Sequence, residues 1–269
     1  MSSSNDIKTS VKEKYAEIAI GTGAGCCGPA SSCCGPDNSI SFSMIGDEYD
    51  NTAGYVPDAD LGLGCGLPTE YAGIKKGDTV VDLGSGAGND VFIARSIVGA
   101  GGKVIGIDMT EEMIEKAISN NKKLGYTNVE FRLGDIEEIP ISENVADVVV
   151  SNCVLNLVPD KSKAFSEIYR ILKPGAHFCI SDIVIQGDLN EELKKSAELY
   201  AGCVSGALQQ TEYVNIIGDT GFGNIDIKKT TSIELPEDVL ALYLSDQGMK
   251  EYQENLKGIF SITVVGTKN

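Results

Sequence analysis

The sequence has no tryptophan, and its 269 residues include one histidine and three arginines. The histidine, His177, lies in an apolar segment typical of a buried strand, so serine–histidine hydrolysis and histidine-rich zinc catalysis are both poorly supported. The shortage of arginine accompanies a formal net charge of −17, and such a charge repels nucleic acids and anionic membranes. We therefore expect no nucleic-acid partner.

Long apolar runs are also missing. No segment is apolar for long enough to cross a bilayer, and the first ten residues are polar, without a signal-peptide core. We therefore expect a cytoplasmic protein with no membrane partner.

The eight cysteines of such a chain favour thiols, metal ligands or redox groups over structural disulfides. No motif addresses the oligomeric state, and a monomer is the default expectation.

The glycine-rich stretch Asp82-Leu83-Gly84-Ser85-Gly86-Ala87-Gly88 follows an apolar, β-branched run and precedes helical apolar spacing. This pattern predicts a strand, a glycine loop and a helix. The loop lacks the Lys-Ser/Thr pair of a P-loop, and its glycine spacing differs from that of the dinucleotide fingerprint. We expect it to bind a nucleoside without a polyphosphate, although a tight turn without a ligand would have the same composition.

Strands and helices are expected to alternate along the chain with short connections. The predicted helices are 7–20, 68–74, 91–98, 111–124, 161–172, 190–201, 211–220 and 236–244, and the predicted later strands are 103–108, 129–133, 146–151, 176–185, 224–233 and 259–267, with a turn at 173–175. This order predicts an α/β fold with a Rossmann-like, seven-stranded, mostly parallel sheet and helices on both faces. The expected divisions are an N-terminal helix and cysteine-rich mobile segment (1–60), a core (61–189), and a small C-terminal α+β region (190–269) that completes the substrate site and the sheet.

Acidic residues stand at the ends of two expected strands. Asp108 ends the second strand, where a carboxylate can accept hydrogen bonds from both ribose hydroxyls. Asp135 follows the third strand and is a candidate acceptor from an adenine amino group, with Ile136 packed on the ring. Helix capping by Asp135 is the alternative.

The cysteines fall into three groups. Cys26-Cys27-Gly28-Pro29 recurs as Cys33-Cys34-Gly35-Pro36, which is a soft-metal or redox appendage or else a plain flexible tail. Cys65 and Cys203 are flanked by glycines, and Cys153 follows a strand at the sheet edge. Zinc would favour close C-x-x-C pairs, so a structural zinc site at these three separated cysteines is poorly supported. Cys179, in the middle of the fifth strand, is interpreted as a small buried hydrophobic residue.

The glycine loop, Asp108 and Gly134-Asp135-Ile136 resemble the corresponding motifs of class I methyltransferases that use S-adenosylmethionine, and Arg170-Ile171-Leu172-Lys173-Pro174-Gly175 resembles their turn before the fifth strand. This resemblance covers roughly residues 74–185. The segments Gly62–Gly66, Ser151–Leu157 and Ala201–Ala207 are similar more specifically to the arsenite methyltransferases, which extends the match to about Gly221.

The resemblance implies that three thiolates, from Cys65, Cys153 and Cys203, bind trivalent arsenic. It also implies that one N-terminal cysteine takes part in turnover. The candidates are Cys26, Cys27, Cys33 and Cys34, and the sequence does not distinguish among them. The implied cofactor-binding residues are Asp82, Gly84, Ser85, Gly86, Asp108, Met109, Asp135, Ile136 and Asn152. The chain departs from the family pattern at Leu67, near Cys65, and at Ala176, after Gly175.

The expected reaction transfers the methyl group of S-adenosylmethionine to arsenite or its thiol complexes, with a thiol reductant such as glutathione or thioredoxin restoring the enzyme. Two alternatives remain open. One is methylation of another small molecule, for instance a quinone precursor, with incidental cysteines. The other is a metalloid-binding or sensing protein without catalysis. No motif beyond Gly221 points to a chemistry.

Overall fold

The computed structural model describes residues 4–21, 49, 52–187, 206–233, 240–241 and 244–269. The helices are α1 (Ser4–Ile20), α2 (Pro68–Tyr71), α3 (Asn89–Val98), α4 (Glu111–Leu124), α5 (Lys161–Ile171), α8 (Gln210–Asp219) and α10 (Asp246–Asn255), with short 3₁₀ turns η1 (Pro57–Ala59) and η2 (Leu155–Leu157). The strands are β1 (Thr79–Leu83), β2 (Lys103–Asp108), β3 (Val129–Leu133), β4 (Ala146–Asn152), β5 (Leu172–Gly187), β6 (Leu208–Gln209), β7 (Phe222–Ile233) and β8 (Leu256–Lys268).

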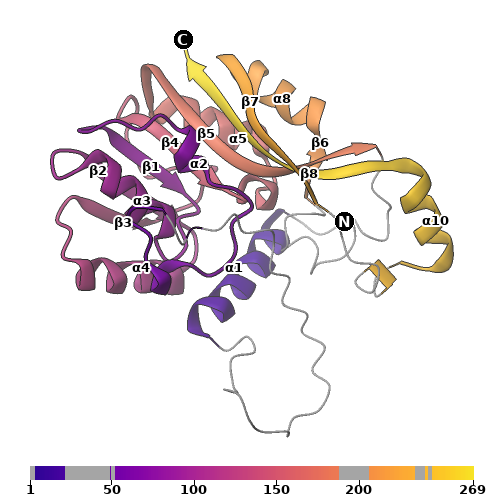
Figure 1. Cartoon of the computed structure of the whole chain (residues 1–269), viewed down its shortest axis with the longest axis horizontal. Helices are drawn as coiled ribbons and strands as arrows, with labels where there is room; N and C mark the ends of the chain where they lie inside the picture. The colour runs from indigo at the N-terminus through magenta and orange to yellow at the C-terminus, as the bar shows by residue number, and fades with distance from the viewer. Residues whose placement is uncertain (1–3, 22–48, 50–51, 188–205, 234–239, 242–243) are drawn as a thin grey trace, which may run out of the picture.

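One sheet runs through the molecule in the order β3-β2-β1-β4-β5-β8-β7, and the two-residue β6 pairs with β5 off this path (Figure 1). The pairs among β1 to β5 are parallel, whereas β8 is antiparallel to both β5 and β7. The order places the first strand in the middle, so the chain winds outward in both directions from β1. The Rossmann-like, mostly parallel fold that the sequence predicts is confirmed, with β6 as an addition.

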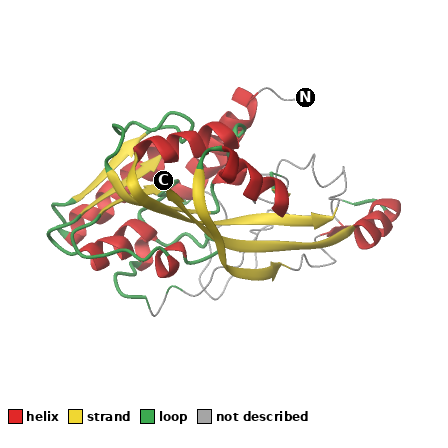
Figure 2. Ribbon diagram, turned by 90° about the horizontal axis from the view of Figure 1, so that it is seen from above, coloured by secondary structure: helices red, strands yellow, loops and turns green. Residues whose placement is uncertain are grey.

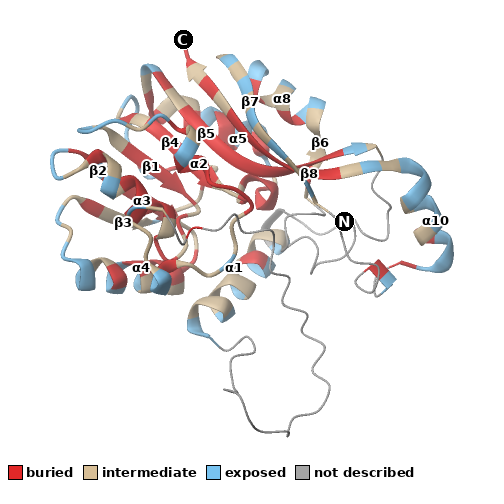
Figure 3. Ribbon diagram, in the orientation of Figure 1, coloured by how far each residue is buried: buried red, intermediate tan, exposed pale blue. Residues whose placement is uncertain are grey.

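The parallel strands β1, β2, β4 and β5 are buried on both faces because neighbouring residues of each strand enter different cores. Val80 of β1 packs in a core with α3, whereas Val81 packs in a core with α5 and α8. Helices therefore cover both faces, and the strands have almost continuous apolar sequences (Figures 2 and 3). Beyond these helices, β5, β7 and β8 extend as a long arm toward α10 (Figure 2).

The element boundaries follow the predictions to within a few residues, apart from one turn and one helix. The predicted turn at 173–175 falls inside β5, where Leu172 pairs with Ala146 but the next pair joins His177 to Val148. The extra residues of β5 bulge out at Gly175, which has a φ of 75°. Helix α10 was not predicted, because it is strongly polar and has few apolar residues to show a period. The predicted helices 190–201 and 236–244 lie wholly or mostly outside the described residues.

Among the described helices, none combines the length and the apolarity that a membrane span needs. The C-terminal strands β7 and β8 continue the sheet of the core, as expected for a region that completes it. The three-part division of the chain stays a prediction.

Candidate functional site

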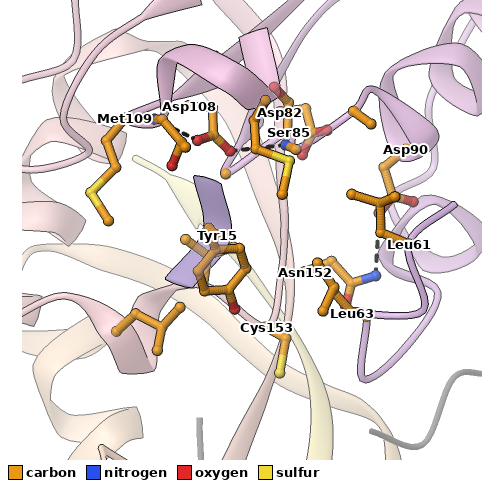
Figure 4. A pocket seen from close by; sticks show the side chains of 18 of the residues that line it. Tyr15, Leu61, Leu63, Asp82, Ser85, Asp90, Asp108, Met109, Asn152 and Cys153 are labelled. Atoms are coloured by element: carbon orange, nitrogen blue, oxygen red, sulfur yellow. Dashed lines mark hydrogen bonds between the residues drawn. The ribbon is translucent and has the colours of Figure 1, made fainter. Parts of the chain in front are cut away.

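A pocket lies where β1, β2 and β4 end, beside the first residues of α3 and below α1 (Figure 4). In open parallel sheets, ligands bind beyond the carboxyl ends of the strands, and this pocket has that position. The expected cofactor residues that line it are Asp82, Gly84, Ser85, Gly86, Asp108, Met109, Asp135, Ile136 and Asn152. The structure therefore brings all nine together.

The glycine loop adopts the tight turn that its composition predicts. Gly84, Gly86 and Gly88 have φ values of 70°, 50° and 102°, in the left-handed region that favours glycine. A Cβ at Gly84 would lie 2.3 Å from a methyl carbon of Val154, so this position also has no room for a side chain. The loop exposes backbone toward the pocket and leads into α3.

Asp108 holds the glycine loop from the neighbouring strand. Its carboxylate accepts from the backbone N–H of Gly86 and of Thr110, each at 2.9 Å. Burial raises the pKa of Asp108, and these hydrogen bonds oppose the shift. The carboxylate that is expected to meet a ribose is thus already fixed in orientation by the loop beside it.

Three carboxylates line one side of the pocket, from Asp82, Asp90 and Asp108 (Figure 4). Burial raises the pKa of Asp82, and the charges of Asp90 and Asp108 raise it further. Burial likewise raises the pKa of Asp90. These carboxylates are shielded from water and lie near other negative charges, so a cationic ligand would be stabilised beside them.

Two buried polar atoms beside these carboxylates lack a hydrogen-bond partner among the described residues. They are the Oγ of Ser85 and the Oδ1 of Asn89, and both residues line the pocket. Buried polar atoms are normally paired, so unpaired ones at a pocket indicate a place for ligand hydrogen bonds. A nucleoside with a positively charged end fits this combination of acceptors and carboxylates.

Helix α1 contributes Lys8, Val11 and Tyr15 to the pocket lining, and Tyr15 projects toward the end of β4 (Figure 4). Lys8 forms ion pairs with Asp135 and, at 2.7 Å, with Glu137. The other oxygen of Asp135 accepts from the backbone N–H of Glu137 in a turn, and no helix begins there. Helix capping by Asp135 is therefore excluded.

Cys153 lines the pocket, and Cys65 packs with it in one apolar cluster. Both are buried, at 3% and 2% exposure, and both belong to one apolar cluster that also contains Val11 of α1. Cys153 directly follows β4 and has a φ of 60°, an uncommon value for a residue with a side chain. In the pocket lining, Figure 4 shows the side chain of Cys153 next to Asn152.

The third expected arsenic ligand, Cys203, lies outside the described residues, as do Cys26, Cys27, Cys33 and Cys34. Ala207, four residues after Cys203, belongs to the same apolar cluster as Cys65 and Cys153. Among the described residues, no group of three or more His, Cys, Asp or Glu side chains is placed to hold a metal ion.

Cys179 and His177 have the structural roles that the sequence predicts. Cys179 is completely buried in β5, and burial raises the pKa of its thiol to about 12, so it is unreactive near neutrality. The Nε2 of His177 pairs with the backbone carbonyl of Ala72. Neither residue lines the pocket.

Sequence reasoning missed Tyr49 and Asp90, and it assigned no individual residue of α1 to the pocket. Asp90 follows the last glycine of the loop by two residues, and an acidic residue in the first turn of a helix is usually interpreted as favourable to the helix dipole. Tyr49 carries no local signal, because its contacts are with residues far along the chain.

A family model described as a methyltransferase domain matches residues 74–221. The arsenite methyltransferase of Halobacterium salinarum is 39% identical over 244 residues, which is 88% of this chain and 60% of that protein. The arsenite methyltransferase of Aquipseudomonas alcaligenes is 36% identical over 190 residues, 68% of this chain and 54% of that protein. The chain thus spans little more than half the length of these curated relatives.

Among solved structures, the arsenic(III) S-adenosylmethionine methyltransferase of Chlamydomonas reinhardtii matches with a TM-score of 0.63 and 33% identity. The match covers 75% of this chain and 66% of that one.

Proposed function

The chain belongs to the methyltransferase-domain family, and on that basis we propose that it transfers a methyl group from S-adenosylmethionine to trivalent arsenic. The products are a methylated arsenical and S-adenosylhomocysteine. The observation that carries the proposal is one pocket with two unlike sides: buried carboxylates beside a glycine loop on one side, and on the other Cys153, which packs in one apolar cluster with Cys65.

The carboxylate wall suits the cosubstrate. Asp108 would accept from the ribose hydroxyls, and Ser85 and Asn89 offer buried polar atoms for further hydrogen bonds. The charges of Asp82 and Asp90 favour a ligand with a positive ammonium or sulfonium group. When bound, S-adenosylmethionine supplies an electrophilic methyl group.

Asp135 and Ile136 would take the adenine end of the ligand. In the structure Asp135 pairs with Lys8 of α1, so an adenine amino group would share or displace that ion pair. Ile136 packs in the same core as Ile107 of β2, lines the pocket and offers an apolar surface to a flat ring.

The thiol wall suits a soft trivalent centre, because thiolates are the ligands that such centres prefer. Cys65, Cys153 and Cys203 would replace the three oxygens of arsenite, which leaves the arsenic lone pair free to form the new bond to carbon. A lone pair needs no general base, in keeping with a pocket that His177 does not reach. The contribution of the protein is then mainly to hold the two reactants in line.

Formation of the arsenic–carbon bond formally oxidises the arsenic by two electrons. We propose that a thiol pair closes to a disulfide and returns those electrons, and that glutathione or thioredoxin then reduces the disulfide. Cys26, Cys27, Cys33 and Cys34 are the candidate members of that pair, and their doubled spacing in the sequence supports the proposal.

The test is incubation of the protein with arsenite, excess thiol and methyl-labelled S-adenosylmethionine, followed by chromatography of the arsenicals. We expect label in methylated arsenic, and no label when Cys65, Cys153 and Cys203 are all replaced by serine. Label transferred to a quinone precursor by the serine variant would support methylation of another small molecule. Binding of arsenite with no consumption of S-adenosylmethionine would support a sequestering or sensing protein.

A further inference from the structure

Cys65 lies in a segment that has no regular backbone pairing. Residues 60–67, between η1 and α2, form no helix or strand, so no ladder of backbone hydrogen bonds fixes the thiol. Side chains from other elements bind this backbone instead. We use the term Cys65 loop for residues 64–66.

Three backbone groups of the Cys65 loop are bonded to side chains. The N–H of Cys65 donates to Oδ1 of Asn152 at 3.0 Å, and Ser261 of β8 donates to the carbonyl of Cys65. The carbonyl of Gly66 accepts from Nδ2 of Asn152 at 2.8 Å and from the hydroxyl of Tyr49 at 3.1 Å. Asn152 therefore contacts the loop on both sides of the thiol-bearing residue.

The orientation of the Asn152 amide decides whether these bonds can form. If the amide turned over, its NH₂ group would face the N–H of Cys65 and its oxygen would face the carbonyl of Gly66, so that donor would meet donor and acceptor would meet acceptor. The loop could then keep neither bond.

Asp90 fixes that orientation. Its Oδ2 lies 3.2 Å from Nδ2 of Asn152, and the single hydroxyl proton of Tyr49 is shared between this carboxylate, at 3.1 Å, and the carbonyl of Gly66. A carboxylate only accepts hydrogen bonds, so it selects the amide orientation in which NH₂ faces α3 and the oxygen faces Cys65. The side chain of Asp90 is buried, which makes an unmatched partner costly.

We propose that Asp90 is a positioning residue that, through Asn152 and Tyr49, sets the place of the Cys65 thiol relative to the glycine loop. This inference rests on the proposed function, because it assigns Asp90 to the arsenic side of the site although Asp90 lines the cofactor pocket. Since Asp90 is in the first turn of α3, the helix that follows the glycine loop also fixes the arsenic ligand.

The test compares the Asp90→Asn variant with wild type by hydrogen–deuterium exchange, in full-length protein without arsenic. We expect the peptide that contains Cys65 to exchange at least about tenfold faster, because a buried charged acceptor is lost. The peptide that contains Cys179 of β5 should be unchanged. Asp226→Asn, which removes an exposed carboxylate on β7, is the matched control and should alter neither peptide.

Tyr49→Phe supplies a second variant that keeps the Asp90–Asn152 contact and removes only the hydroxyl. It should accelerate exchange of the Cys65 peptide by a smaller factor than Asp90→Asn does. Equal acceleration of the Cys65 and Cys179 peptides in both variants would mean general destabilisation and would overturn the proposal, as would an unchanged Cys65 peptide in Tyr49→Phe.

Ligand binding separates the positioning role from a cofactor role. In Asp90→Asn, kcat for arsenite methylation at saturating S-adenosylmethionine should fall about tenfold or more, and this loss should exceed the loss of affinity for S-adenosylhomocysteine. A large loss of cofactor affinity with unchanged exchange at Cys65 would overturn the proposal. If the exchange results hold but wild type methylates no arsenite, then the proposed function fails and the coupling of Asp90 to Cys65 stands.

Discussion

Replacing Gly66 by alanine should displace the Cys65 loop with very little change in composition. A Cβ at Gly66 would lie 2.6 Å from Oγ and 2.7 Å from Cβ of Ser181 on β5, far inside ordinary contact distance. Ser181 is fully buried and its hydroxyl pairs with Thr263 of β8, so it cannot turn away without losing that bond. The loop and the strand must therefore separate by most of an ångström.

Overpacking of this size typically costs about 1–3 kcal/mol of unfolding free energy. We expect Gly66→Ala to lose roughly that amount in chemical denaturation. We also expect arsenite methylation to fall by at least tenfold, since a misplacement of about 1 Å can reduce a rate about a hundredfold. Affinity for S-adenosylhomocysteine should change little, because Gly66 does not line the pocket.

Two further variants separate this clash from a general effect of alanine. Gly101→Ala has no heavy atom within 4 Å of the new Cβ and should behave as wild type. Ser181→Gly removes both clashing atoms, so the double variant with Gly66→Ala should be less destabilised than the sum of the two single variants. Full stability and full activity of Gly66→Ala would refute the close docking of the loop on β5.

Three other perturbations test separate parts of the molecule. Asp108→Asn leaves one carbonyl oxygen for the two backbone donors, Gly86 and Thr110, so the glycine loop is held less firmly. Calorimetry should then show about tenfold weaker binding of S-adenosylhomocysteine. The affinity for arsenite should be unchanged in the same variant. Burial raises the pKa of Asp182 to about 7, so its contribution to stability is complete in acid and is lost as the pH rises toward 7. Asp182→Asn should therefore reduce the fall in unfolding free energy with rising pH, measured by denaturation at several pH values. An unchanged fall would contradict this prediction. Lys8→Met removes the ion pair to Asp135, so the amides of α1 should exchange hydrogen faster than in wild type. Exchange at the wild-type rate would mean that apolar contacts alone hold the helix.

Much of the fold could be predicted from the sequence because its strands are apolar and its helices have clear periods. Strands 103–108 and 129–133 and the helix 111–124 occur at the predicted residues. The predicted turn at Lys173–Gly175 was wrong as a strand boundary, since a bulge lets β5 begin earlier without breaking its pairing with β4. Local composition does not show whether a turn ends a strand or bulges from it.

The candidate site was only partly predictable. The glycine loop and Asp108 carry local signals, because a turn and a strand end each leave a residue pattern. Tyr49 and Asp90 are recognisable only through Asn152, which is 62 residues from Asp90 and 103 from Tyr49. Such contacts form because the fold brings segments that are far apart along the chain together at the sheet edge. A single sequence does not show which distant segments become neighbours.

The bond from Ser261 to Cys65 has a consequence for the order in which the site is built. It joins residues 196 positions apart, and β8, which carries Ser261, inserts between β5 and β7. During synthesis on the ribosome the parallel strands emerge before β8, and Cys65 gains its Ser261 partner only after a further 196 residues have been made. Contacts of such long sequence separation form late in folding. A newly made chain would therefore contain the nucleoside pocket before Cys65, the proposed arsenic ligand, is held in place.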